Sequence, residues 1–211
     1  MRNFRPCPAV RFIYPQAVLR FRTTGKEACL TFDDGPDPLS TPQILETLDR
    51  HKIKAVFFCS GVQAGKYPDL MERIIIGGHV TGNHGYRHLN GFRHTLKEYT
   101  GDVMKASADT SSFLFRPPYG FLRPRQYLRL KRDFRIILWD VMAYDFDPGF
   151  GIANMSEVLR KKVRPGSIIV LHDKPSSMAM EILEDFLLFA EEEGYRFILP
   201  GFVRPETGTP R

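Results

Sequence analysis

The chain has 211 residues, 43% hydrophobic and 12% aromatic, which is enough to bury one substantial core and too little for a multidomain assembly. Its net charge of +6 comes entirely from the first 26 residues, because the rest of the chain is neutral. The basic residues of that segment are Arg2, Arg5, Arg11, Arg20, Arg22 and Lys26. A nucleic-acid-binding domain carries its basic residues through the folded body, so no nucleic-acid partner is expected.

Residues 1–25 are predicted to form a basic N-terminal arm ahead of the domain. Its apolar stretch at 10–21 is interrupted by Arg11, Pro15, Gln16 and Arg20, so it predicts neither the core of a signal peptide nor a membrane-spanning helix. The apolar side chains of the stretch would allow weak association with an anionic membrane surface. Packing of the arm on the domain is the favoured interpretation.

Three cysteines are scattered along the chain, at Cys7, Cys29 and Cys59. Their spacing matches neither a zinc site nor a disulfide framework, and the last two lie in apolar runs, so reduced thiols are expected. The chain is therefore expected in the cytoplasm or at a membrane surface, as a monomer.

Beyond the arm, short apolar runs alternate with helical patterns, which is typical of repeated βα units around a parallel sheet. The predicted domain covers residues 26–201, and residues 202–211 are predicted to be a flexible tail. Seven strands are expected, at 27–33, 55–59, 79–82, 113–115, 134–139, 167–172 and 195–199.

Helices are expected between these strands. Thr41 is predicted to cap one helix that begins at Pro42, and a second is expected at 67–76, ended by two glycines. Thr95 and Glu98 have the spacing of a capping box. A further helix is predicted at 177–193, ended by a glycine.

Seven such units can close into a barrel or lie open as a doubly wound sheet, and the pattern alone does not decide between them. Both arrangements place chemistry beyond the carboxyl ends of the strands. The polar residues follow this rule: Asp33 and Asp34 end the first predicted strand, His84 and His88 follow the third, and His172 ends the sixth.

Asp33 and Asp34 are adjacent carboxylates followed by the chain breaker Gly35-Pro36. Adjacent acids repel and are costly to bury unless a cation or hydrogen bonds compensate them, although an acidic helix cap is an alternative. His84 and His88 are four residues apart, so on a helical turn they would share one face. Together with Asp34 they could bind one metal ion and leave positions open for water and substrate.

Two further segments place ionisable side chains at strand ends. Arg116 precedes the stiff turn Pro117-Pro118-Tyr119-Gly120, in which the prolines expose neighbouring backbone N–H groups. A structural turn with a surface arginine is the alternative. His172 ends an apolar strand, where partial burial would tune its pKa for acid–base chemistry, and a satisfied core histidine is the alternative.

In order and spacing, these segments resemble the five motifs of the NodB-homology polysaccharide deacetylases, carbohydrate esterase family 4. The motifs are Thr31-Phe32-Asp33-Asp34-Gly35-Pro36, the His84 and His88 pair, Arg116-Pro117-Pro118-Tyr119-Gly120, the stretch 139–146, and Leu171-His172. The resemblance covers roughly residues 26–199. It implies an α/β fold, a distorted and incomplete (β/α)7 barrel, and an N-acetylated oligosaccharide or polysaccharide as the substrate.

The resemblance also implies a metal centre and a base. Asp34, His84 and His88 would hold one divalent metal ion, with zinc expected and cobalt, nickel or manganese as alternatives. This ion would polarise the acetamide carbonyl and acidify a water molecule. Asp33 would be the general base, and Arg116 would hold it ionised and oriented.

The remaining motif residues would act on the substrate. His172 would protonate the leaving amine, Asp145 would tune this histidine, and the backbone N–H of Tyr119 would stabilise the oxyanion. The apolar lining of the pocket for the acetyl methyl group would consist of Trp139, Val170 and Leu171.

Three residues depart from the family pattern: Gly85 stands where serine or threonine is usual, Phe146 replaces tryptophan, and Met142 replaces a residue that is often acidic. These changes predict weaker tuning rather than loss of activity. Two other functions stay open: hydrolysis of a non-glycan amide or imide, and glycan or metal binding by a homologue with impaired catalysis. The retained Asp33, Arg116 and His172 favour an enzyme, because binding alone requires neither a base nor an acid.

Overall fold

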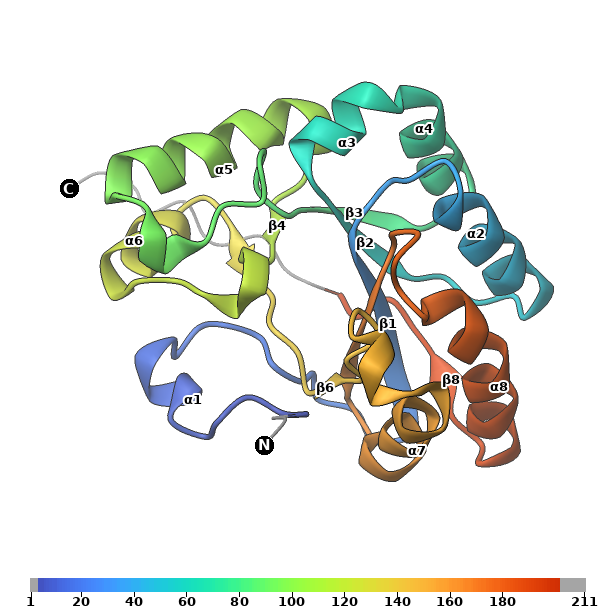
Figure 1. Ribbon diagram of the computed structural model, residues 1–211. Coiled ribbons are helices and arrows are strands. Elements are labelled where there is room, and N and C mark those ends of the chain that lie inside the picture. Colours follow the sequence, from blue (N-terminus) through green and yellow to red (C-terminus); the bar gives the residue numbers. More distant parts are fainter. Residues whose placement is uncertain (1–3, 202–211) are drawn as a thin grey trace.

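The computed structural model describes residues 4–201, so Arg2 and the tail predicted at 202–211 lie outside the described residues. Parallel strands curl around the centre of the molecule, and helices cover their outer face (Figure 1). The strands are β1 (Glu27–Asp34), β2 (Val56–Cys59), β3 (Val80–Asn83), β4 (Leu114–Phe115), β5 (Arg135–Ile136), β6 (Val141–Met142), β7 (Ile168–His172) and β8 (Arg196–Phe197). The α-helices are α1 (Val10–Ile13), α2 (Ser40–Arg50), α3 (Gly61–Lys66), α4 (Pro68–Ile76), α5 (Leu96–Thr110), α6 (Pro124–Leu130), α7 (Ile152–Lys162) and α8 (Ala179–Glu192).

Strand order confirms the predicted incomplete barrel. Seven strands follow the path β5-β4-β3-β2-β1-β7-β6, and β8 pairs with the first residues of β1. The strands β5 and β6 are consecutive in the chain but end the path, so the barrel is open between them. The strand predicted at 134–139 is therefore shorter than expected, because only β5 lies within that range, and β6 was not predicted. After Ile137 donates its N–H to Phe115, the chain crosses the opening, and the N–H of Asp140 donates to Ile168 at the start of β7.

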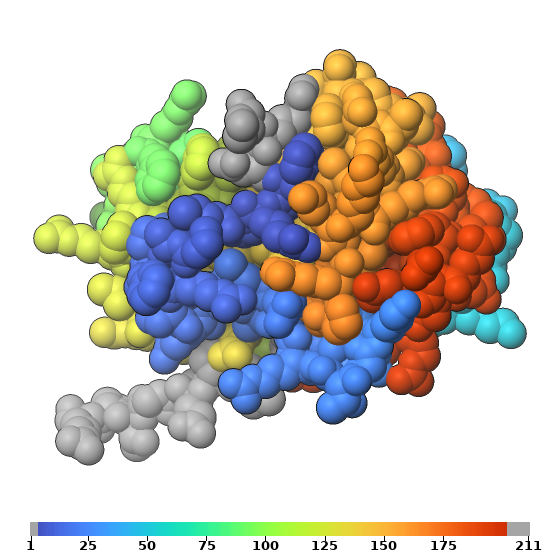
Figure 2. Space-filling model, turned by 90° about the horizontal axis from the view of Figure 1, so that it is seen from below, coloured from blue at the N-terminus to red at the C-terminus, as the bar shows by residue number. Residues whose placement is uncertain are grey.

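The N-terminal segment 18–21 lies in this opening. Val18 donates its N–H to the carbonyl of Ile136 at 2.9 Å and accepts from the N–H of Leu138 at 2.8 Å. On the other side, the N–H of Phe21 donates to Gly166 at 3.0 Å. Figure 2 shows the N-terminal residues, in blue, lying across the molecule between the yellow-green and orange parts of the chain. Residues 4–25 thus pack on the barrel, as the favoured interpretation of the arm expected.

The two faces of β1 divide the core. Leu30 and Phe32 belong to the larger cluster, between the sheet and the helices α2, α4, α7 and α8. Cys29 belongs to a smaller cluster with Phe58 and Ile168. Successive strand residues point to opposite faces, so Thr31 and Asp33 share the face of Cys29. This face is the interior of the barrel, and it leads to the carboxyl edge where the chemistry was predicted.

Several helix boundaries differ from the predicted ones. Helix α2 begins at Ser40 instead of Pro42, and Thr41 lies inside the helix, where its hydroxyl donates to Asp173 at 2.6 Å. Helix α8 begins two residues later than predicted, at Ala179. The capping box of Thr95 and Glu98 is confirmed at the start of α5. The helices α3, α6 and α7 were not predicted.

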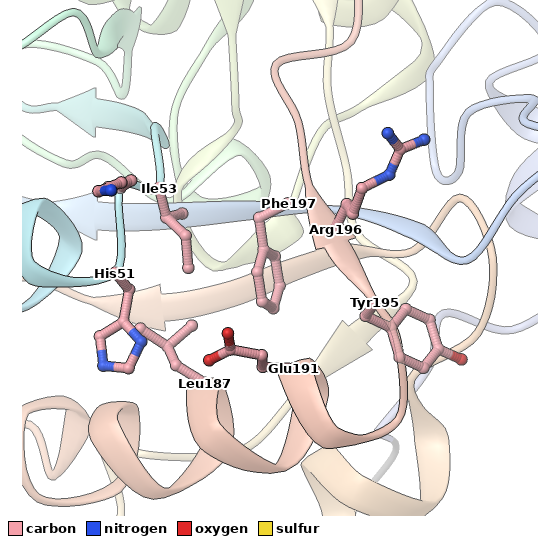
Figure 3. Close-up of a pocket in the computed structure, with 8 residues that line it drawn as sticks. His51, Ile53, Leu187, Glu191, Tyr195, Arg196 and Phe197 are labelled. Atoms are coloured by element: carbon pink, nitrogen blue, oxygen red, sulfur yellow. The ribbon is translucent and has the colours of Figure 1, made fainter.

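A small cavity of about 220 Å³ lies between α8, β8 and the turn after α2. It is at the opposite end of the barrel from the carboxyl ends of the strands. Figure 3 shows that Phe197 and Leu187 both face this space, with His51 and Glu191 beside them. Its position at the amino end of β1 separates it from the predicted site. Among residues 4–201, no helix is long and apolar enough to cross a bilayer.

Candidate active site

The first strand delivers both acidic residues to the carboxyl edge of the barrel. Asp33 continues the inward-facing series of β1 and is buried. Asp34 follows with a positive φ of 80°, so its carboxylate turns into the same space instead of pointing to the opposite face. The strand end therefore curls as its sequence predicted, and the two acids share one site.

Asp34, His84 and His88 lie together, with their ligand atoms all within 4.8 Å of one another. Oδ1 of Asp34 is 3.6 Å from Nε2 of His84 and 3.1 Å from Nε2 of His88. The expected helical turn is wrong, because His84 directly follows β3 and His88 lies in an irregular loop with a φ of 56°. A loop brings the two rings to a centroid distance of 5.0 Å.

This cluster fits a divalent cation. Oδ1 of Asp34 is buried and accepts no hydrogen bond of good geometry from the described residues. Nδ1 of His84 lies 2.8 Å from the carbonyl of Arg116, and an N–H at that position leaves the lone pair of Nε2 directed at Asp34. Burial lowers the pKa of His84 to about 4, so its ring is neutral near pH 7, which is the form that binds a metal.

Asp102 of α5 braces the loop between the two histidines. Its Oδ2 accepts the backbone N–H groups of Tyr86 at 2.8 Å and Arg87 at 3.1 Å, and its Oδ1 accepts Nε of Arg87 at 2.8 Å. Gly85 has a φ of 76°, and a Cβ there would lie 3.3 Å from Oδ2 of Asp102. Asp102 thus holds the loop without a hydroxyl at position 85. Sequence reasoning missed this residue, because no local pattern links α5 to the loop.

Arg116 is fully buried inside the barrel and pairs with Asp33. Its Nη1 donates to Oδ1 of Asp33 at 2.6 Å and to the hydroxyl of Thr31 at 2.7 Å, and its Nη2 donates to the carbonyl of Leu138 at 3.0 Å. The guanidinium also lies 4.1 Å from the centre of the Phe58 ring. These contacts fix the arginine, which in turn compensates the charge of Asp33 and orients one of its oxygens.

His172 ends β7 and is held by Asp145. Oδ1 of Asp145 lies 2.9 Å from Nδ1 of His172, and Oδ2 accepts the backbone N–H of His172 at 2.7 Å and the hydroxyl of Ser177 at 2.6 Å. Burial lowers the pKa of His172, but the charge and hydrogen bond of Asp145 outweigh burial, so the pKa is raised. The ring of Phe146 packs edge-on against His172 at 4.9 Å.

A cavity of about 540 Å³ joins these groups. Its lining includes both acids and all three histidines, together with Tyr119 and Trp139. The ring of Tyr119 packs edge-on against His88, with the ring centres 4.6 Å apart. Val170 and Leu171 do not line this cavity, because they lie below the strand end and are fully buried. Their expected position in an apolar methyl pocket stays a prediction.

Sequence reasoning missed two further parts of the lining. Lys174 donates to Oδ2 of Asp34 at 2.7 Å, which leaves Oδ1 for the histidines. Arg5, Pro6 and Cys7 of the N-terminal segment form part of one wall. Both contacts depend on the tertiary fold, so no spacing in the sequence could have predicted them.

Comparison with known proteins agrees with this geometry. A sequence model of the family described as polysaccharide deacetylase matches residues 21–134. A peptidoglycan-N-acetylglucosamine deacetylase of Bacillus cereus is 33% identical over 182 residues, which cover 82% of this chain and 66% of that protein. A chitooligosaccharide deacetylase of a Bradyrhizobium species is 30% identical over 181 residues, which cover 82% of this chain and 80% of that protein.

Solved structures show the same architecture. The crystal structure of the Bc1960 peptidoglycan N-acetylglucosamine deacetylase, in complex with a naphthalenyl N-oxidanyl-benzamide, matches with a TM-score of 0.80 and 30% identity. The match covers 87% of this chain and 90% of that chain. A curled parallel barrel with acids and histidines at its carboxyl edge is the architecture of the NodB-homology class of carbohydrate esterases. The chain belongs to the polysaccharide deacetylase family.

Proposed function

We propose that this protein is a metal-dependent hydrolase that removes N-acetyl groups from a glycan of the N-acetylglucosamine type. The observation that carries this proposal is that Asp33, which pairs with Arg116, and His172, which pairs with Asp145, line one cavity together with the Asp-His-His cluster. Glycan binding alone requires neither a base nor an acid. The names of the two relatives support an N-acetylated glycan as the substrate.

Asp34, His84 and His88 would hold one divalent ion. We propose zinc, since two imidazoles and one carboxylate with open positions suit catalytic zinc, although cobalt, nickel and manganese accept the same donors. Such an ion supplies Lewis acidity, which polarises the acetamide carbonyl and lowers the pKa of water. The second oxygen of Asp34 stays with Lys174, which fixes the orientation of the carboxylate.

Asp33 takes a proton from the attacking water as the general base. Arg116 holds one of its oxygens, and the other faces His84, with Oδ2 of Asp33 3.9 Å from Nε2 of the histidine. The base is therefore positioned beside the ligand cluster and is shielded from bulk water. Its charge is compensated by a guanidinium that is fixed by the barrel interior, so the carboxylate does not move to meet the substrate.

His172 protonates the leaving amine. Its raised pKa increases the share of imidazolium near neutral pH, and Asp145 keeps the ring in one orientation through Nδ1. The backbone N–H of Tyr119 would donate to the developing oxyanion. Water attack and amine departure are thereby assigned to side chains from β1 and β7, which are neighbouring strands.

Acetate release tests the proposal. The purified chain is incubated with N-acetylated and O-acetylated glycans, with and without a chelator and added zinc. We expect chelator-sensitive acetate release from N-acetylated oligomers, and Asp33→Asn should abolish turnover while the metal stays bound. The exposed Asp69 gives a matched Asp→Asn control that should retain activity. Ring opening of a cyclic imide without acetate release from any glycan would refute this function.

A further inference from the structure

A second cavity adjoins the catalytic one and is strongly cationic. It measures about 780 Å³, and its lining includes Arg5, Arg11, Arg20 and Arg164 with Asp140. Arg5, Pro6, Cys7 and Trp139 line both cavities, so the two share a wall. We call the second one the arginine cavity. Most of its lining comes from the N-terminal segment, which lies across this part of the molecule (Figure 2).

The single acid of this lining, Asp140, already has hydrogen-bond and ion-pair partners. Oδ2 of Asp140 accepts Nε of Arg164 at 3.0 Å and the hydroxyl of Ser167 at 2.7 Å, while Nε of Arg5 lies 3.5 Å from Oδ1. Within residues 4–201, Arg11 and Arg20 form no ion pair. Both are exposed, so their guanidinium groups are accessible to a ligand.

The positive charges in the cavity repel one another. Burial lowers the pKa of Arg5, the charge of Asp140 partly offsets burial, and the charges of Arg164 and Arg20 lower the pKa further. Nε of Arg5 is buried and has no hydrogen-bond partner of good geometry among the described residues. An anion in the cavity would relieve this repulsion and receive charge-assisted hydrogen bonds, because guanidinium groups bind carboxylate and phosphate oxygens in a forked geometry.

We propose that the arginine cavity binds a carboxylate or phosphate group of the glycan chain while a neighbouring sugar occupies the catalytic cavity. This inference rests on the proposed function, because it assigns a charged substituent to that substrate. The shared wall of Arg5 to Cys7 and Trp139 places the two cavities within the length of one oligosaccharide. A concave site with several guanidinium groups suits an anionic group on a chain better than a flat surface does.

The kinetic test compares two substrates of equal length with the full chain. One is a neutral chitotetraose, and the other alternates N-acetylglucosamine with N-acetylmuramic acid, whose lactyl groups carry carboxylates. For the double variant Arg11→Gln and Arg20→Gln, we expect the ratio of the KM for the anionic substrate to the KM for the neutral one to rise about tenfold. The double Arg→Lys variant should restore part of the loss. Arg132→Gln, an exposed change away from both cavities, should leave the ratio unchanged.

A binding test separates this inference from the proposed function, because it needs no turnover. Oligogalacturonate, which carries carboxylates and no acetamide, is titrated into the wild-type chain and the double glutamine variant by calorimetry. We expect binding that weakens with salt and is lost in the variant. Equal binding by both proteins would overturn the inference. If no glycan releases acetate but arginine-dependent binding persists, the proposed function fails and the anion site stands.

A membrane is the other source of anionic groups. Vesicles of phosphatidylglycerol and vesicles of phosphatidylcholine are compared in a sedimentation assay with the same variants. We expect the double glutamine variant and the Arg132→Gln control to bind the anionic vesicles to the same extent. Strong binding to these vesicles that depends on Arg11 and Arg20, without oligogalacturonate binding, would overturn the substrate site in favour of a lipid headgroup site.

Discussion

Replacing Asp102 by alanine tests how the metal-binding loop is held. The carboxylate accepts two backbone N–H groups of the loop, from Tyr86 and Arg87, and the side chain of Arg87. Asp102 is buried, whereas Arg87 is exposed. The alanine therefore leaves two backbone donors without their partner, while Nε of Arg87 can turn to water.

The magnitude follows from these two backbone contacts. A hydrogen bond to a charged group contributes about 1.5 kcal/mol at the lower end of the measured range, so at that lower end the pair contributes roughly 3 kcal/mol. Part of this loss is recovered by water, because Tyr86 is half-buried. We therefore expect the Kd for zinc to rise roughly 10- to 100-fold, as is typical when a supporting partner of a metal ligand is removed.

Competition with a chromophoric chelator measures this affinity. Asp102→Asn keeps an acceptor of the same shape and should lie between the wild type and the alanine variant. Asp109→Ala, an exposed change on the same helix, serves as the control and should leave the Kd unchanged. An unchanged zinc affinity in the Asp102→Ala variant, with the fold intact by circular dichroism, would refute the assignment of Asp102 as the brace of the loop.

Three other changes probe the catalytic groups. Arg116→Met removes the compensating charge of a buried acid, so turnover should fall at least about 100-fold and stability should drop by roughly 3–5 kcal/mol in urea unfolding; near-wild-type values in both would contradict the pairing. Asp145→Asn removes the main cause of the raised pKa of His172, and because the acid must be protonated, the alkaline limb of the kcat/KM profile should move to lower pH. An unmoved limb would argue against His172 as the acid. Chelation should abolish acetate release, and added zinc should restore it together with a higher Tm; activity that survives chelation would remove the metal from the reaction.

Local patterns predicted the parts of the site that one segment builds by itself. The apolar strand of β1, followed by Gly35-Pro36, predicted where Asp33 and Asp34 lie, because a strand end and a chain breaker are both read from neighbouring residues. His84 and His88 were expected to meet, and they do, but the helical turn invoked for them is a loop with positive φ at Gly85 and His88. Spacing alone does not distinguish a helical turn from such a loop.

Contacts between distant segments could not be predicted where they lie outside the family motifs. Thr31, Asp102 and Lys174 support the site through partners that lie on other elements of the barrel. The strand predicted at 134–139 was too long for a similar reason, since its apolar residues first pair with β4 and then cross an opening to reach β7. Apolar periodicity reports that such residues are buried, but it does not report which strand they pair with.

The N-terminal segment in the barrel opening has a consequence for synthesis. Val18 pairs with Ile137, and Arg20 pairs with Ser167, so both bridges join residues that the ribosome makes far apart in time. At about 5–20 residues per second, the partners of this segment emerge several seconds or more after it does. Residues 18–21 therefore wait for partners that are made much later, and we expect closure of the barrel to be a late step of folding, because its contacts are far apart in the sequence.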